Sequence, residues 1–156
     1  MIFSKQTSYA VRALVYLAQN NSKGAVLATV IAKAENLPAP FLSKLLGELS
    51  ANGVVTGARG PGGGFTLAKD PKDISLYDIF LLYDGLTLAK DCLLGCGVCS
   101  DETACCIHEH WKNNKAAIEQ FLKSTTIADL AVMRDEQRIS IIETASAKRR
   151  KYKATD

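Results

Sequence analysis

The sequence VVTGARGPGGGFTL at residues 54–67 has the composition of a β-hairpin. Its two ends, Val54–Thr56 and Phe65–Leu67, are rich in β-branched and aromatic residues, which favour short strands. Five of the eight residues between them are glycine, and Arg59 is the one charged side chain there. A glycine-rich segment between two β-prone runs is typical of a flexible turn. We therefore expect a two-stranded hairpin with Arg59 at its tip.

Three short helices are predicted before this hairpin. Ser4 is placed to cap the first, residues 20–24 form a turn before the second, and Pro40 lies in the first turn of the third, where its missing N–H costs nothing. Gly53 follows at the position of a C-terminal cap. Apolar residues recur at helical spacing in all three helices. The positions expected to be buried are Ala10, Ala13, Leu14, Leu17 and Ala18 in the first, Leu27, Val30, Ile31 and Ala34 in the second, and Phe41, Leu42, Leu45, Leu46 and Leu49 in the third.

Further helices are predicted after the hairpin. Ser75 and Asp78 have the spacing of a capping box that opens a fourth helix, with Gly85 near its end. Helical periodicity returns between Ile107 and Leu122. A second capping box, at 126–129, predicts a last helix that runs to about residue 133, and residues 139–145 extend it in our prediction.

These elements together predict a mostly α-helical fold, a winged helix-turn-helix with a two-stranded β wing. In such a fold the third helix enters the major groove of DNA and the hairpin is the wing. The small or basic residues Ser43 and Lys44 lie on the expected outer side of the third helix. Arg59 is placed to reach a groove or phosphates, and the neighbouring glycines remove side chains that would block close approach. The candidate DNA-binding residues are Ser43, Lys44, Arg59, Gly60, Gly62 and Gly63.

The same glycine run does not predict a nucleotide site. A phosphate-binding loop of the P-loop type needs a glycine-rich turn followed by Lys-Ser or Lys-Thr, and neither follows here.

Composition narrows the class of protein further. The chain has 156 residues, of which 47% are hydrophobic, and a net charge of +3. It has no apolar run near the roughly 20 residues that a membrane helix needs, and its start lacks the basic and apolar segments of a signal peptide. We therefore expect no membrane partner and a cytoplasmic location.

Charge and pattern divide the chain into four expected parts. Residues 1–83 form the winged helix-turn-helix and residues 84–108 a cysteine-rich loop. Residues 109–135 form a long helix and the short final helix, and residues 136–156 are a basic tail, which we expect to be flexible. The mildly basic first part suits a polyanion.

All five cysteines lie within residues 92–106, among glycine and polar residues that indicate a loop. Closely spaced thiolates favour iron–sulfur clusters, zinc or copper(I). Two ligand sets are open: Cys92, Cys99, Cys105 and His108, or the zinc-like set in which Cys96 replaces Cys92. His108 lies one helical turn after Cys105, so both can face one ion. Redox chemistry at the adjacent pair Cys105–Cys106 is a weaker third reading, because adjacent cysteines form strained disulfides.

Four stretches of the chain resemble the Rrf-two superfamily of winged-helix transcription regulators, and most of all its iron–sulfur regulators of the IscR type. Residues 4–14 are similar to the first helix of that family, and residues 59–65 to its wing. The spacing Cys105-x-x-His108-x-x-Trp111 is similar to its last cluster cysteine, its histidine and its tryptophan, and residues 126–130 to the start of its final helix. The resemblance covers roughly residues 1–135.

The resemblance implies a homodimer paired through the long helix after the cysteine loop. It also implies a [2Fe–2S] cluster whose ligands, by register with His108 and Trp111, are Cys92, Cys99, Cys105 and His108. Cys96 and Cys106 lack counterparts in the family, and Cys96 stays an alternative ligand, with a [4Fe–4S] cluster or zinc as alternative cofactors.

Three positions depart from the family pattern. Regulators of the NsrR type hold a [4Fe–4S] cluster with a carboxylate from the partner's first helix, and the corresponding residue here is Ser8. Pro40 and Ser43 stand where IscR-like members carry a polar and an acidic residue, so the operator sequence does not transfer. Arg59 does carry over as a groove contact.

The sequence therefore predicts a homodimeric regulator, a repressor rather than an enzyme, that binds palindromic double-stranded DNA under the control of an iron–sulfur cluster. The alternative is a zinc-stabilised winged-helix interaction module.

Overall fold

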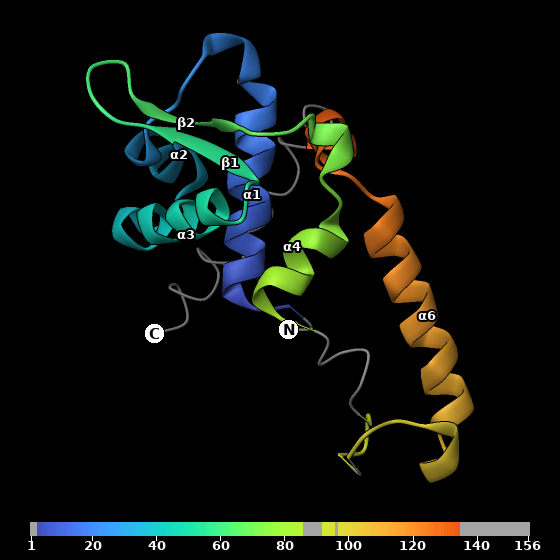
Figure 1. Cartoon of the computed structure of the whole chain (residues 1–156). Coiled ribbons are helices and arrows are strands. Elements are labelled where there is room, and N and C mark those ends of the chain that lie inside the picture. The colour runs from blue at the N-terminus through green and yellow to red at the C-terminus, as the bar shows by residue number, and fades with distance from the viewer. Residues whose placement is uncertain (1–2, 86–91, 96, 135–156) are drawn as a thin grey trace, which may run out of the picture.

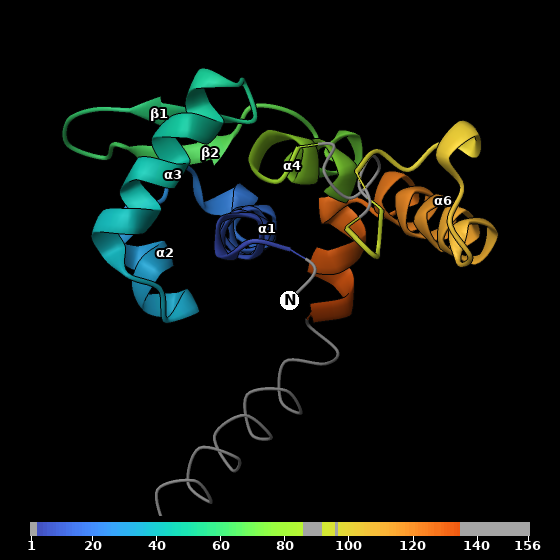
Figure 2. The same cartoon turned by 90° about the horizontal axis from the view of Figure 1, so that it is seen from below.

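The computed structural model describes residues 3–85, 92–95 and 97–134, and the fold is mostly helical with one small antiparallel sheet (Figure 1). The helix α1 (Lys5–Gln19) lies at the centre. On one side of it lie α2 (Ala28–Glu35) and α3 (Ala39–Ala51), and on the other lie α4 (Leu76–Tyr83) and the C-terminal helix at 127–134 (Figure 2). The remaining elements are β1 (Val55–Ala58), β2 (Gly64–Leu67), α6 (His108–Ser124), and 3-10 turns at Asn21–Lys23, Pro71–Asp73 and Asp101–Thr103. The predicted tail, 136–156, and the proposed helical extension, 139–145, lie outside the described residues.

Two of the three helices of the first part bury the faces that their periodicity predicts. Ser4 caps α1, since its side chain accepts a hydrogen bond from the Thr7 N–H at 3.1 Å. In α3 the four leucines are buried and Phe41 is half-buried, and Gly53 follows the helix with a φ of 67°. Ala18, expected in the core, is half-buried. The buried core residues of α1 and α3 are Ala10, Ala13, Leu14, Val15, Leu17, Leu42, Leu45, Leu46 and Leu49.

Of the four residues predicted on the buried face of α2, Ile31 is buried and the other three are not. Leu27 and Val30 are 55% and 46% exposed, and Ala34 is exposed as well. Ile31, Ala32 and Glu35 are the residues that face the core. The helix has eight residues, so apolar spacing over two turns could not fix its rotation; contacts with distant residues do.

Glu35 is the charged member of that face, and two arginines from other helices pair with it. Its side chain is fully buried, and its carboxylate lies 2.5 and 2.6 Å from the guanidinium of Arg134 in the C-terminal helix. The Nε atom of Arg12 in α1 is 3.4 Å from the same carboxylate, and Arg12 also donates to the Glu35 carbonyl. This ion-pair cluster of Glu35, Arg12 and Arg134 therefore joins α2 to α1 and to the C-terminal helix.

The predicted hairpin is present, slightly longer than its β-prone residues. β1 and β2 pair antiparallel from Val55 opposite Leu67 to Ala58 opposite Gly64. Phe65 also exchanges backbone hydrogen bonds of 2.8 and 3.0 Å with Val26, which ties the hairpin to the segment before α2. The hairpin lies on the side of the molecule away from α6 (Figures 1 and 2).

Gly63 is a position in the hairpin where a side chain does not fit, as is the neighbouring Gly64. A Cβ there would lie 2.5 Å from the Ala58 carbonyl oxygen and 2.8 Å from that of Gly60. We expect Gly63→Ala to destabilise the protein by about 1–3 kcal/mol, since such overlap forces the backbone to shift. Gly47→Ala is the matched control: nothing lies within 4 Å of that Cβ in α3, so it should stabilise by about 0.5–1 kcal/mol. Urea unfolding measures both, and equal effects of the two variants would contradict the prediction.

Both predicted capping boxes are present, and they lie back to back. Ser75 and Asp78 close the first, and Thr126 and Asp129 close the second, with bonds of 2.7–3.2 Å. The two turns also bond to each other, from the Leu76 N–H to the Thr125 carbonyl and from the Ile127 N–H to the Ile74 carbonyl, both at 2.9 Å. This joint, residues 74–76 with 125–127, fixes the C-terminal end of α6 to the segment that follows the hairpin.

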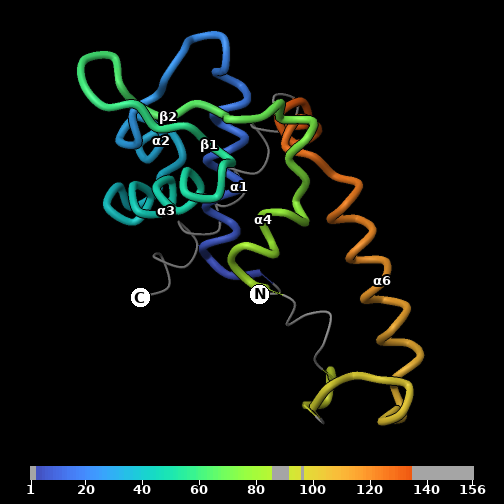
Figure 3. The backbone as a smooth tube through the Cα atoms, in the orientation of Figure 1, coloured from blue at the N-terminus to red at the C-terminus, as the bar shows by residue number. Residues whose placement is uncertain are grey.

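The rest of α6 projects away from the winged part (Figures 1 and 3). Its Phe121 is 55% exposed, and the buried residues of the helix are His108 and Leu122. Beside the joint lies an apolar pocket of about 270 Å³, whose lining includes Phe3, Val11, Leu76, Phe80, Leu122 and Leu130. Within the described residues, no helix has the length and apolarity to cross a bilayer.

Candidate metal centre and nucleic-acid interface

The cysteine-rich loop lies at the N-terminal end of α6, which is the end of that helix farther from the hairpin (Figures 1 and 3). Short backbone bonds shape its described part. The Cys92 N–H donates to the Gly97 carbonyl at 3.0 Å, and the Gly95 N–H donates back to the Cys92 carbonyl at the same distance. The His108 N–H donates to the Cys105 carbonyl at 3.0 Å, which leads the chain into α6. These bonds are local, so each fixes the path of the chain at one end of the loop.

The four predicted cluster ligands, Cys92, Cys99, Cys105 and His108, form two pairs. The sulfurs of Cys92 and Cys105 are 3.8 Å apart, and the Cys99 sulfur is 3.4 Å from His108 Nδ1. The three cysteines are half-buried and His108 is buried, 5% exposed. Cys106 is exposed, and the alternative ligand Cys96 lies outside the described residues.

The separation within each pair fits two ligands of one metal ion. A tetrahedral ion that holds two thiolates at about 2.3 Å places their sulfurs about 3.8 Å apart, and a thiolate and an imidazole nitrogen about 3.5 Å apart. A single ion with all four ligands would bring every donor within about 4 Å of every other. In the described part of the chain, the one group of three or more candidate ligand atoms within 4.8 Å of one another is Asp101, His108 and Glu109, which contains no cysteine. Each pair is therefore spaced for one ion, and the four side chains of the described residues do not gather around a single point.

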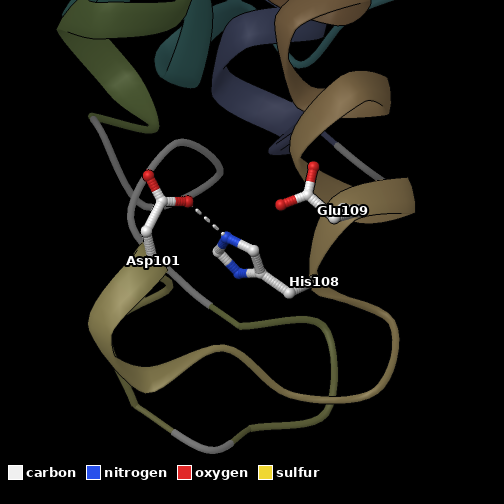
Figure 4. Close-up of side chains that lie close together, drawn as sticks. All are labelled: Asp101, His108 and Glu109. Atoms are coloured by element: carbon white, nitrogen blue, oxygen red, sulfur yellow. Dashed lines mark hydrogen bonds and ion pairs between the residues drawn. The ribbon is translucent and has the colours of Figure 1, made fainter.

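His108 has a second polar partner on the other side of its ring. Its Nε2 lies 2.9 Å from Asp101 Oδ1, and Figure 4 shows these two side chains pointing toward one another, with Glu109 on the helix side. The Lys112 ammonium donates to the same oxygen at 2.7 Å. Two hydrogen bonds lower the pKa of Asp101, the larger effect coming from Lys112 and the smaller from His108. The carboxylate is therefore an ionised acceptor at neutral pH.

Sequence reasoning missed Asp101 and Lys112. Lys112 lies four residues after His108, so the two share one face of α6, and Asp101 lies between two predicted ligands. Both positions are visible in the sequence. Acidic residues are common in loops, however, and spacing alone does not show whether Asp101 or Glu102 contacts His108.

The expected DNA-binding residues of the third helix lie on its exposed side. Ser43 and Lys44 are exposed, and the Ser43 hydroxyl donates to the Ala39 carbonyl at 3.0 Å. The Lys44 ammonium is 3.9 Å from Glu48 Oε1, a loose pair in which the Lys44 side chain stays 78% exposed. Such a pair is worth little, so Lys44 is available to an incoming anion.

The wing residues divide into two kinds. Arg59, Gly60 and Gly62 are exposed at the tip, and the two glycines have φ values of 97° and 76°, which favour glycine. Gly63 is buried, with its N–H bonded to the Gly60 carbonyl at 2.8 Å. Gly63 therefore shapes the turn that presents Arg59.

Comparison with known proteins places the whole described fold in one family. The model of the Rrf2 family, described as an iron-dependent transcriptional regulator, matches residues 3–133. The sequence is 43% identical over 132 residues to a candidate HTH-type transcriptional regulator of Aquifex aeolicus (strain VF5), covering 83% of this chain and 91% of that protein. It is 30% identical over 130 residues to the HTH-type transcriptional regulator IscR of Escherichia coli (strain K12 / DH10B), covering 83% and 80%.

Solved structures agree with the sequence match. CymR, the global cysteine regulator of B. subtilis, superposes with a TM-score of 0.74 at 26% identity, covering 85% of this chain and 98% of that one. T. potens IscR superposes with a TM-score of 0.67 at 28% identity, covering 90% and 92%. The chain therefore belongs to the Rrf2 family of winged-helix transcriptional regulators, which bind DNA and are not enzymes.

Proposed function

We propose that the protein is a homodimeric transcription regulator, acting as a repressor in the cytoplasm, whose binding to palindromic operator DNA is controlled by a [2Fe–2S] cluster. Cys92, Cys99, Cys105 and His108 would hold the cluster. The observation that carries the proposal is the division of these four side chains into two pairs, each spaced for one tetrahedral ion.

The donor set fits a two-iron cluster better than its alternatives. In such a cluster each of the two irons takes two ligands from the protein, and thiolate and imidazole are both known ligands. A mononuclear zinc site needs its four donors around one point, which the described residues do not provide. A [4Fe–4S] cluster of the NsrR type would draw on the position of Ser8, whose hydroxyl is a poor metal ligand.

The DNA-binding part of the proposal rests on α3 and the hairpin. Both lie on the side away from α6, and they expose Ser43, Lys44 and Arg59 (Figure 1). The exposed glycines beside Arg59 let the backbone approach DNA closely.

The long helix α6 supports the homodimer. Much of its surface is exposed in the single chain, including Phe121 at 55%. Pairing two copies along α6 would cover such apolar surface and place two α3 helices for two half-sites of a palindrome.

Control of DNA binding needs a difference in free energy between two states. When bound, the cluster supplies cross-links among residues 92–108 and a group that iron limitation, oxidants or nitric oxide alter. Those residues lead directly into α6, which is fixed to the winged part at the joint 74–76 with 125–127. A preference of about 1–3 kcal/mol for one arrangement of α6 is the usual size of such coupling.

The test starts with anaerobic purification of the full chain, a visible spectrum, and counts of iron, acid-labile sulfide and zinc. About two irons and two sulfides per chain support the proposal. One zinc and no colour would overturn the cluster and favour the zinc-stabilised module. Selection from a pool of random palindromic duplexes, with and without the cluster, then tests DNA binding. Failure to select any duplex in either state would overturn the proposal that this protein regulates transcription by binding operator DNA.

Removal of Arg59 is expected to weaken DNA binding without touching the metal. Arg59→Ala should cost about 1–3 kcal/mol of binding free energy and reduce the dependence on salt, because one phosphate or groove contact is lost. Lys72→Ala, at the exposed 3-10 turn Pro71–Asp73, removes the same charge outside both the wing tip and α6 and is the control. Fluorescence anisotropy at several salt concentrations measures both; equal losses would show that Arg59 acts through net charge.

A further inference from the structure

The two nitrogens of the His108 ring face different partners. Nδ1 lies 3.4 Å from the Cys99 sulfur, and Nε2 lies 2.9 Å from Asp101 Oδ1. A neutral imidazole has one N–H and one free lone pair, and a carboxylate only accepts. The N–H therefore belongs on Nε2, which leaves the lone pair of Nδ1 directed toward Cys99.

Asp101 is itself held in place from two directions. The Lys112 ammonium donates to the same carboxylate oxygen at 2.7 Å. The backbone around Asp101 is a 3-10 turn, Asp101–Thr103, capped by the side chain of Ser100. Asp101 thus reaches His108 from the loop, while Lys112 comes from α6, so the three side chains join the loop to the helix.

Burial makes this orientation selective. His108 is 5% exposed, so its ring has little water to replace a lost partner. In metal sites, a carboxylate that accepts from the far nitrogen of a histidine fixes the ring and raises its basicity as a ligand. Glu109 and Glu102 are also acidic neighbours, but Asp101 is the one that bonds the ring in the described structure.

We propose that Asp101, supported by Lys112, is the positioning residue for His108 and makes Nδ1 the nitrogen that binds the metal ion shared with Cys99. The inference rests on the proposed function, since it concerns the fourth ligand of that cluster. It assigns a role to a residue that is not itself a ligand.

The first measurement uses the reduced, cluster-free chain, so it does not depend on the cluster. Long-range proton–nitrogen correlation NMR with labelled histidine reports which ring nitrogen carries the proton. Wild type should show His108 with the proton on Nε2. Asp101→Ala should lose this preference, whereas Glu102→Ala, which removes an exposed carboxylate of the same turn, should keep it. Circular dichroism checks that each variant is folded.

The second measurement uses the chain loaded with iron and sulfide. Pulsed EPR of the reduced cluster, with 15N placed at Nδ1 or at Nε2 of histidine, should show strong coupling to Nδ1. Asp101→Ala should lose iron to a chelator about 10- to 100-fold faster than wild type, as is usual when such a partner is removed. Lys112→Met should show a smaller acceleration, and it keeps the test open if Asp101→Ala does not fold.

The outcomes separate the two proposals. Coupling to Nε2, an unchanged tautomer in Asp101→Ala, or equal iron loss in Asp101→Ala and Glu102→Ala would overturn the role of Asp101. A wild-type chain with the Nε2–H tautomer and no iron would overturn the cluster instead, while leaving the orientation of His108 by Asp101 in place.

Discussion

Cys105→Ser is expected to leave the protein without its iron–sulfur cluster, whereas Cys106→Ser is expected to keep it. The two residues are neighbours in sequence, but the Cys105 sulfur is 3.8 Å from Cys92 and the Cys106 side chain is exposed. A serine hydroxyl is a much weaker ligand than a thiolate for iron in a sulfur-rich site. Iron and sulfide per chain should fall to near zero in the first variant and stay at the wild-type level in the second.

The winged part should survive this loss, because Cys105 does not belong to the hydrophobic core. Far-UV circular dichroism should therefore change little in either variant. Loss of iron from both variants alike would show that Cys106 is needed as well as Cys105, and the expectation that Cys106 is not a ligand would then be wrong. Retention of iron in Cys105→Ser would contradict the ligand set.

Arg134→Met is expected to destabilise the fold by about 3 kcal/mol. It removes the partner that lies 2.5 and 2.6 Å from the fully buried Glu35 carboxylate, and a buried charge that loses its partner costs several kcal/mol. Arg12 remains, but its Nε is 3.4 Å away and its side chain is 40% exposed. Arg59→Met, at the exposed wing, should change the free energy of unfolding by less than about 0.5 kcal/mol.

A double variant distinguishes two causes of the destabilisation: the buried Glu35 carboxylate left without its partner, and the lost contact of the C-terminal helix. Replacing Glu35 as well, in Glu35→Met/Arg134→Met, should return stability to within about 1 kcal/mol of wild type, because no carboxylate is then left buried. Urea unfolding of the four members of the cycle gives the coupling energy. If the double variant is as unstable as Arg134→Met, the effect comes from the end of the C-terminal helix rather than from the charge.

Local sequence signals predicted the elements whose contacts are local. The leucines of α3 and the two capping boxes depend on residues three or four positions apart, and all were found where expected. The hairpin followed from its glycine-rich turn. On α2 the prediction found Ile31 but missed Glu35, which is buried by its contacts with Arg12 and Arg134, 23 and 99 residues away. Spacing along one helix carries no record of such partners.

For the candidate metal site, the sequence predicts ligand types but not how the side chains are arranged. The five cysteines and His108 predict a site for a metal that prefers soft ligands. The resemblance to the family then implies which four of these residues are the ligands. Spacing does not show which ligand lies beside which, because the path of the loop depends on backbone bonds of Cys92 with Gly95 and Gly97, and of Cys105 with His108. The partnership of His108 with Asp101 was invisible for the same reason.

The joint at 74–76 and 125–127 makes α6 a lever. At 1.5 Å per residue, its 17 residues span about 25 Å from the cysteine end to the fulcrum. A tilt of about 10° about this joint would move the cysteine end by about 4 Å. With two such rods held together in a dimer, the same tilt would swing the two α3 helices instead. The distance between the two α3 helices would then no longer match the distance of about 34 Å between successive major grooves of DNA.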